Sequence, residues 1–368
     1  MAEPAVDAVD AVDVLLTGPV FFDLIFTDVN GPPLPGTEVH ATGLASSPGG
    51  VANLAVATAR LGLSTALAAT LGDDVYGRWC WEFLADREGI DLTSSRLMPG
   101  WPTPVTVSIA TGSDRSMITH EVASPVSAGE LVVDRVKARA TFADLGAMSR
   151  GARADDAWWL QAAHAGTKIF ADIGWDSSGR WDTADLQPLD DCFAFMPNEA
   201  EAMAYTRTQS AIAAARALAD RVPLVVVTRG DQGAVAIDSS RGHEVTVPAV
   251  SATGRDATGA GDVFGAALVL GTLREWPLEQ SLSFAALCAA LAVEHPGGAL
   301  AAPGWGDLAD WWIRTRSGGD RELVARFSFL AEVVPEASGR RRSEFPFPFT
   351  DYQATASRRS FPDKRGTS

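Results

Sequence analysis

The 368-residue chain has little cysteine and a deficit of positive charge. Its three cysteines, Cys80, Cys192 and Cys288, lie far apart, which excludes a disulfide framework and a Cys-x-x-Cys metal site. The net charge of −16 argues against a nucleic-acid partner, because the phosphate backbone binds basic surfaces. Nucleotides stay open as ligands, because they bind through local loops and a metal ion.

Long apolar runs and two common nucleotide motifs are also missing. No apolar run reaches the roughly 18 residues of a membrane helix, so we expect no membrane partner. The acidic N-terminus, MAEPAVDAVDAVD, lacks the basic start of a signal peptide, and we expect a cytoplasmic location. The absence of GxxxxGK[ST] excludes the P-loop NTPases, and no GxGxxG follows the first predicted strand.

Apolar periodicity predicts an α/β fold for residues 12–336. Strands are expected at 12–17, 63–72, 140–146, 167–172, 191–195, 222–228, 233–238 and 243–250, and helices at 51–61, 75–88, 129–139, 154–163, 199–205, 210–220, 258–272 and 279–294. Strands separated by helices imply a mostly parallel sheet with helices on both faces. Early β pairs interrupt this pattern and predict a small β lid, formed by parts of 18–48 and 101–123. Such a lid would close over a site at the carboxyl ends of the strands.

The two ends of the chain differ from this pattern. Residues 1–11 repeat a small AVD unit and are predicted to be a flexible tail. Residues 337–368 hold seven Lys or Arg against three Asp or Glu and show no period. They are predicted to be a disordered, basic C-terminal tail, and solvation is favoured over binding to nucleic acid or lipid.

The strongest motif is DATGAGD, Asp256 to Asp262, which lies between a predicted strand and an apolar helix. Gly259, Ala260 and Gly261 let the backbone approach a ligand closely. At a helix start, unpaired N–H groups and the helix dipole form an anion hole suited to a phosphate. Asp262 beside that phosphate could take a proton from an attacking hydroxyl as a general base. Taken alone, the motif fits an N-cap aspartate on a glycine-rich turn equally well.

This segment resembles the second signature of the PfkB/ribokinase family of carbohydrate and nucleoside kinases. The family's first signature, a Gly-Gly pair shortly before an Asn at a helix start, is matched by Gly49, Gly50 and Asn53. The resemblance runs from about Val12 to about Pro303, with the two signatures in the right order. It implies a ribokinase-like, three-layer α/β/α fold with a mostly parallel central sheet and a small β-sheet lid.

The resemblance also implies a substrate site. Gly49 and Gly50 would let backbone amides approach sugar hydroxyls, and Asn53 offers donors and an acceptor to a diol. Asp23 corresponds to the acidic residue that accepts hydrogen bonds from substrate hydroxyls in the family. The alternatives are an exposed turn aspartate for Asp23 and a helix-start residue for Asn53.

Two further motifs imply a metal and a nucleotide. Asn198 and Glu201 match the family's Asn-x-x-Glu motif, which helps to position Mg²⁺ largely through water. The alternative is a helix N-terminus with acids in its first turn. Thr228, Gly230 and Gly233 match a Thr-x-Gly-x-x-Gly turn that contacts nucleotide phosphates, and a plain hairpin turn is the alternative.

Weaker assignments complete the predicted site. The segment that begins at Cys288 is expected to line the base pocket, where family members often have an Asn nearby. A monovalent cation, K⁺ above all, is permitted near Asp256 and the Gly297-Gly298 turn. Asp172 follows a predicted strand and receives no role.

The expected reaction is phosphoryl transfer from ATP to a small sugar, with Asp262 as general base and residues 259–261 as anion hole. A primary hydroxyl is expected as the acceptor, because it reaches furthest into a phosphate site. A nucleoside kinase is the alternative within the family, and a catalytically silent sugar- or nucleotide-binding regulatory protein is the alternative outside it. Thr103, Met117 and His120 are candidates for side chains that face the pocket. A homodimer through the lid would cover its strand edges.

Overall fold

The computed structural model describes residues 11–29, 31, 34–111, 114–132, 137–147, 157–174, 176, 178–253, 257–295, 297–339 and 341–343. Asp256, the candidate for a monovalent-cation site, lies outside these residues. So do residues 1–10 and most of the predicted C-terminal tail.

An eight-stranded sheet forms the centre of the molecule, in the order β14-β13-β12-β11-β10-β9-β1-β4. Its strands are β1 (Val12–Thr17), β4 (Thr65–Ala68), β9 (Ala138–Asp144), β10 (Lys168–Asp172), β11 (Ala194–Phe195), β12 (Leu224–Thr228), β13 (Ala234–Asp238) and β14 (His243–Val247). The pairings from β4 to β12 are parallel, and β12, β13 and β14 pair antiparallel. The predicted, mostly parallel sheet is confirmed.

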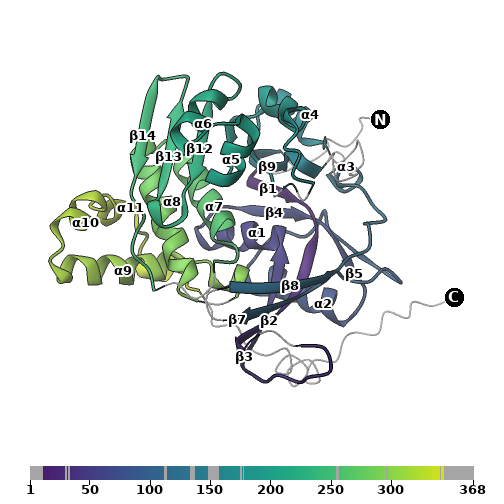
Figure 1. The fold of residues 1–368 in the computed structure, drawn as a ribbon. Coiled ribbons are helices and arrows are strands. Elements are labelled where there is room, and N and C mark those ends of the chain that lie inside the picture. The colour runs from purple at the N-terminus through teal and green to yellow at the C-terminus, as the bar shows by residue number, and fades with distance from the viewer. Residues whose placement is uncertain are drawn as a thin grey trace, which may run out of the picture.

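Helices cover both faces of this sheet (Figure 1). One face packs in a core with α1 (Val51–Arg60), α2 (Val75–Glu82), α7 (Ala260–Leu273), α8 (Leu278–Val293) and α9 (Trp305–Gly318). A second core joins the other face to α4 (Trp159–His164), α5 (Glu199–Thr206) and α6 (Ala211–Leu218). Residues buried on two opposite faces of the same strands, such as Phe170 and Ile169 of β10, belong to different cores, as expected for a sheet between two helical layers.

A separate four-stranded sheet has the order β3-β2-β7-β8. It consists of β2 (Val20–Val29), β3 (Ala41–Gly50), β7 (Val105–Thr111) and β8 (Asp114–His120), which come from the two segments predicted for the lid. Figure 1 shows it below the central sheet, next to α2. A short parallel pair, β5 (Thr70–Gly72) and β6 (Arg96–Met98), follows β4.

Several predicted elements differ from the structure. The helix expected at 129–139 is shorter, because α3 is Ala128–Val132 and β9 already begins at Ala138, where it pairs with Val12 of β1. The strand expected at 63–72 divides into β4 and β5, and α2 gives way at Phe83–Arg87 to a π-helical turn, η1. A 3₁₀ segment, η4 (Thr183–Asp191), precedes the two-residue β11.

The chain continues in regular structure beyond the last predicted helix. A 3₁₀ turn, η6 (Gly298–Ala301), leads to α9, α10 (Arg321–Arg326) and α11 (Leu330–Val333), and a 3₁₀ turn η7 spans Ala337–Gly339. The next residues pack on α9, where Gly306 N–H donates to Arg341 O and Ser343 N–H donates to Asp307 Oδ2, both at 2.7 Å. Residues 341–343, within the predicted C-terminal tail, therefore make defined contacts with α9.

Candidate active site

The turn between β3 and α1 depends on two glycines. Gly50 has φ +62°, and a Cβ there would collide with the carbonyl oxygen of Pro19, which accepts a hydrogen bond from Val51 N–H at 3.1 Å. A Cβ on Gly49 would collide with the carboxylate of Asp23 in the neighbouring strand β2. The pair therefore lets Asp23 lie close to the backbone just before α1.

The helix α7 begins at the second signature. Its N-cap is Gly259, at φ +75°, and Val263 N–H closes the first helical turn by donating to Gly259 O at 2.9 Å. The amides of Gly261 and Asp262 lie in the first turn, where N–H groups have no partner within the helix. Together with the positive end of the helix dipole, they give this turn the character of an anion site.

One hydrogen bond joins the two signatures across 209 positions of sequence: Asn53 Nδ2 donates to Asp262 Oδ2 at 3.0 Å. Asn53 is buried, and its Oδ1 has no hydrogen-bond partner among the described residues. Gly259 and Gly298 both approach this amide closely enough that an added Cβ would touch it. The arrangement leaves a buried acceptor beside the Asp262 carboxylate, ready for a donor such as a hydroxyl.

Burial raises the pKa of Asp262 to about 6, and the hydrogen bond from Asn53 opposes this rise. A carboxylate with this pKa is largely ionised at pH 7 and is still a better proton acceptor than an ordinary surface aspartate. Its properties therefore suit general-base catalysis near neutral pH.

A cavity of about 640 Å³ opens at the carboxyl ends of the central strands. It contacts six of the predicted site residues: Gly50, Asn198, Glu201, Thr228, Gly261 and Asp262. Asp23, Gly49 and Asn53 do not line it, but Asn53 donates to Asp262 and Asp23 lies against Gly49, the neighbour of Gly50. Of the candidates for lid side chains, Met117 is exposed on β8, and Thr103 is buried with its hydroxyl donating to Asp74 Oδ1 at 2.8 Å.

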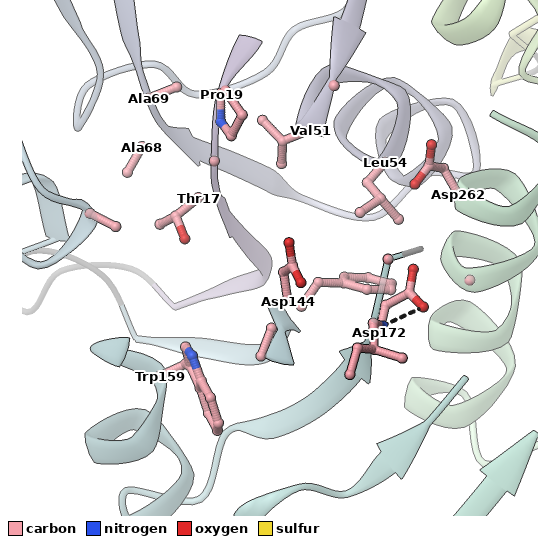
Figure 2. A pocket seen from close by; sticks show the side chains of 18 of the residues that line it. Thr17, Pro19, Val51, Leu54, Ala68, Ala69, Asp144, Trp159, Asp172 and Asp262 are labelled. Carbon is pink, nitrogen blue, oxygen red and sulfur yellow. Dashed lines mark hydrogen bonds between the residues drawn. The ribbon is translucent and has the colours of Figure 1, made fainter. Parts of the chain in front are cut away.

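Three carboxylates of the cavity, those of Glu121, Asp144 and Asp172, were not assigned from the sequence. Asp144 and Asp172 end the neighbouring strands β9 and β10 and are paired in register, so both reach the same edge of the sheet. Figure 2 shows both carboxylates beside the cavity, with Asp172 nearer to Asp262. A carboxylate directly after an apolar, buried strand was the signal that could have identified them.

Burial, followed by the nearby carboxylates of Glu201 and Asp262, raises the pKa of Asp172 to about 7. The side chain opens into the cavity and is exposed there, although protein atoms surround it on its other sides. No Lys, Arg or His is found among the described residues that line the cavity. A polyanionic nucleotide therefore needs a cation to share this space with the carboxylates.

Asn198 and Glu201 form a capping box at the start of α5. Glu201 N–H donates to Asn198 Oδ1 at 2.9 Å, and Asn198 N–H donates to Glu201 Oε2 at 3.0 Å. The helix-start alternative is therefore present in the structure, yet both residues also line the cavity. Burial raises the pKa of Glu201, in spite of its hydrogen bonds with Asn198. Thr228, at the end of β12, is bridged to Asn198 and also lines the cavity.

The carboxylate and amide oxygens at this edge of the central sheet are ligands that suit a hard cation. Carboxylate and amide oxygens are the ligands that Mg²⁺ prefers, and it usually keeps several waters and binds through substrate phosphates. Within the described ranges, no three His, Cys, Asp or Glu side chains are arranged as a closed metal cage. The residues therefore suit a hydrated ion held partly by a nucleotide.

Three residues predicted to contact the nucleotide, Gly230, Gly233 and Cys288, do not line the cavity. Gly230 has φ +54° in the turn after β12, and Gly233 has φ +89° and packs against the backbone at Val247 of β14. Cys288 is fully buried in α8, and burial raises the pKa of its thiol well above the usual range. Its side chain belongs to the core and not to an open base pocket.

Residues 13–304 match the model of the pfkB family of carbohydrate kinases. The chain belongs to this family. Membership confirms the resemblance to carbohydrate kinases and the enzyme class that it implied. Within the described residues, none of the helices has the length and apolar character to cross a membrane.

Individual relatives agree with this assignment. The chain is 27% identical over 260 residues to a ribokinase of Haemophilus influenzae, covering 67% of this chain and 80% of that protein. It is 27% identical over 257 residues to a fructoselysine 6-kinase of Shigella flexneri, covering 69% and 92%. The solved structure of Arabidopsis thaliana ribokinase, complexed with ribose and ATP, is similar with a TM-score of 0.62 at 24% identity, covering 80% of this chain and 96% of that one. This last likeness shows the shared fold.

Proposed function

We propose that this pfkB-family kinase transfers the γ-phosphoryl group of ATP to a hydroxyl, preferably primary, of a small sugar. The observation that carries the proposal is the hydrogen bond between Asn53 and Asp262, at the start of α7 and beside the cavity. It joins the predicted substrate contact to the predicted base. The ribokinase and fructoselysine 6-kinase relatives support a sugar as the acceptor.

In this reaction the acceptor hydroxyl gives its proton to the Asp262 carboxylate as its oxygen bonds to the γ-phosphorus. The bond between that phosphorus and the bridging oxygen of ADP breaks, and ADP leaves with the electron pair. The amides of Gly261 and Asp262 stabilise charge on the transferred group. Asp23, Gly49, Gly50 and Asn53 would hold the other sugar hydroxyls.

Mg²⁺ would be held through water by Asn198 and Glu201, near Asp172, and it would neutralise the charge of the nucleotide phosphates. Thr228, which lines the cavity, would contact the same phosphates. The lid sheet would exclude water from the transferring group, which limits hydrolysis of ATP.

The decisive variant is Asp262→Asn, which keeps the shape of the side chain and removes the base. We expect sugar-dependent ADP release to fall by a factor of about 10² or more, with ATP binding retained. Asp220→Asn, at an exposed position, is the matched control and should keep wild-type turnover. Wild-type turnover in Asp262→Asn would refute the assignment of the base.

A screen of sugars and nucleosides separates the alternatives. A nucleoside kinase would release ADP with nucleosides in preference to sugars. A silent binding protein would bind these compounds in calorimetry and release no ADP above background with any of them, with or without K⁺.

A further inference from the structure

The cavity continues well beyond the catalytic carboxylates. Its far end, here named the distal lobe, is formed by Ala68, Ala69, Val126, Leu131 and Trp159. Figure 2 shows Asp262 and Asp172 on one side, Trp159, Ala68 and Ala69 on the other, and Asp144 between them. The two ends belong to one continuous space, so a single molecule can reach both.

The distal lobe is apolar because of where its residues come from. Ala68 is the last residue of the buried strand β4, and Ala69 follows it. Leu131 lies on α3, and Trp159 is the first residue of α4. All five residues are less than a tenth exposed. Their free surface therefore faces mainly the cavity, and it offers apolar contact with no charge of its own.

The hydroxyl groups beside the distal lobe already have partners within the protein. Thr17 Oγ1 accepts a hydrogen bond from Trp158 Nε1 at 3.1 Å. Ser124 Oγ donates to Val126 O at 2.7 Å and lies 3.2 Å from Thr70 Oγ1. Sugar hydroxyls placed against the five apolar side chains would lose bonds to water without equivalent replacements, whereas an apolar group would gain by leaving water.

The size of the cavity supports the same conclusion. Its volume of about 640 Å³ lies within the roughly 300–1,000 Å³ that accommodates drug-sized ligands, and the nucleotide phosphates and Mg²⁺ would take only the end at Asn198, Glu201 and Thr228. A free monosaccharide at Asp262 would leave the distal lobe filled with water against apolar walls.

We propose that the acceptor is a sugar derivative that carries an uncharged apolar substituent of about the size of a phenyl ring, with this substituent in the distal lobe. The inference rests on the proposed function and specifies its substrate class. The transfer step is unchanged: the sugar hydroxyl attacks the γ-phosphorus, Asp262 takes its proton, ADP leaves, and the substituent takes no part in bond making.

The test compares ribose, fructose and glucose with their methyl and phenyl glycosides as acceptors for ADP release. We expect at least one phenyl glycoside to exceed its parent sugar by about tenfold or more in kcat/KM, the size of effect that an added apolar contact gives in an enzyme pocket. The methyl glycoside should fall between the two.

A variant that reduces the lobe gives the second arm. Ala128, half-buried at the start of α3, lines the cavity beside Val126 and Leu131, so Ala128→Leu should reduce the space for the ring. Its kcat/KM for the phenyl glycoside should fall about tenfold, and that for the parent sugar should stay within about twofold. Ala217→Leu, at an exposed position of α6, is the matched control and should change neither.

The outcomes separate this inference from the proposed function. If parent sugars are phosphorylated and no phenyl glycoside is preferred, or if Ala128→Leu lowers both activities equally, the inference is overturned and the kinase assignment stands. If no compound is phosphorylated, calorimetry with phenyl ribofuranoside still tests the inference. Binding that is weaker in Ala128→Leu than in the wild type supports a site for the ring in the distal lobe. No binding at millimolar concentration overturns it.

Discussion

At the scale of single residues, Asn53 controls the base as well as the substrate site. Its hydrogen bond to Asp262 opposes the effect of burial and so holds the pKa of that carboxyl down. In Asn53→Ala this bond is lost and the pKa of Asp262 rises above about 6. Because only the ionised carboxylate accepts a proton, kcat falls at low pH, and the midpoint of this acid limb should move to higher pH. The measurement is kcat against pH from 5 to 9 at saturating sugar and ATP.

The direction of the shift is the critical result for Asn53. An acid limb that stays in place, with only KM for the sugar changed, would mean that Asn53 binds substrate without influencing the base. A shift to lower pH would contradict the role of this hydrogen bond. Asn53→Gln, which keeps the amide, should retain more of the wild-type profile than Asn53→Ala.

The raised pKa of Asp172 makes the free energy of unfolding depend on pH. Its pKa of about 7 in the folded protein lies above the ordinary value of 3.8, so the folded state binds the proton more tightly than the unfolded state. Its contribution to stability is therefore present at low pH and is lost as the pH rises from about 4 to about 7. Asp172→Asn should raise the free energy of unfolding at pH 8 by on the order of 1 kcal/mol, since the open cavity screens the charge, and by much less at pH 5.

Urea denaturation without nucleotide or Mg²⁺, at pH 5 and at pH 8, measures this difference. Equal effects at both pH values would show that Asp172 titrates normally. Asp220→Asn, at an exposed position, serves as the control.

The sequence predicted the residues whose spacing is set by local backbone geometry. Gly49, Gly50 and Gly259 occupy positions where a Cβ would collide or φ is positive, and such positions leave a glycine signature in the sequence. Asp144 left only the weaker signal of a carboxylate at the end of an apolar strand, because its place beside Asp172 follows from strand register, which pairs segments far apart. Cys288 was assigned to the base pocket from the resemblance to the family, and the sequence of α8, which is apolar all round, does not reveal which face is open.

At the scale of elements, a buried ion pair positions the turn beside the active site. Arg60, at the end of α1, pairs with Glu88 at 2.7 Å, and both side chains are almost fully buried. The same guanidinium donates to Leu300 O at 2.8 Å and to Ala302 O at 2.7 Å, which fixes η6. Gly298 of η6 in turn packs against the Asn53 amide. The ion pair therefore links α1, η1 and η6 behind the catalytic residues.

Arg60→Met should be strongly destabilising. It leaves the Glu88 carboxylate and two carbonyl groups buried without their main partner, which typically costs about 3–5 kcal/mol. Arg216→Met is the matched control, because Arg216 pairs with Glu244 at 3.0 Å on the exposed surface and should lose less than about 1 kcal/mol. Chemical denaturation gives both values. Similar losses in the two variants would contradict the assigned importance of the buried pair.

The elements themselves were predictable to different degrees. Long periodic helices with clear ends, such as α1 before Gly62, matched the structure. The region 129–139 was assigned too much helix, because its apolar spacing also suits the strand β9, and pairing with β1 decides between them. The helices after 294 were not predicted as separate elements, although the buried residues of α9 follow the helical period, at Trp305, Leu308, Ala309 and Trp312.

At the scale of the whole molecule, the C-terminal segment 341–343 ties distant parts of the chain together. Arg341 donates to Glu88 O at 2.8 Å and pairs with the Glu88 carboxylate at 3.1 Å, while its own carbonyl accepts from Gly306 N–H. Gly304 and Gly306 leave room for this backbone, since a Cβ on either would collide with it. The segment thus covers the buried Arg60–Glu88 pair and binds the start of α9.

Two truncations test this role, because they differ only in the segment 340–343. Ending the chain at Gly339 removes the contacts of Arg341 and Ser343, and we expect the free energy of unfolding to fall by about 1–3 kcal/mol, with a matching fall in Tm. Ending it at Ser343 keeps those contacts and should leave Tm close to that of the full chain. Scanning calorimetry of the three proteins gives the comparison. Equal Tm values for the two truncated chains would show that stability does not depend on the segment, and a larger loss for the chain ending at Ser343 than expected would assign it to residues 344–368 instead.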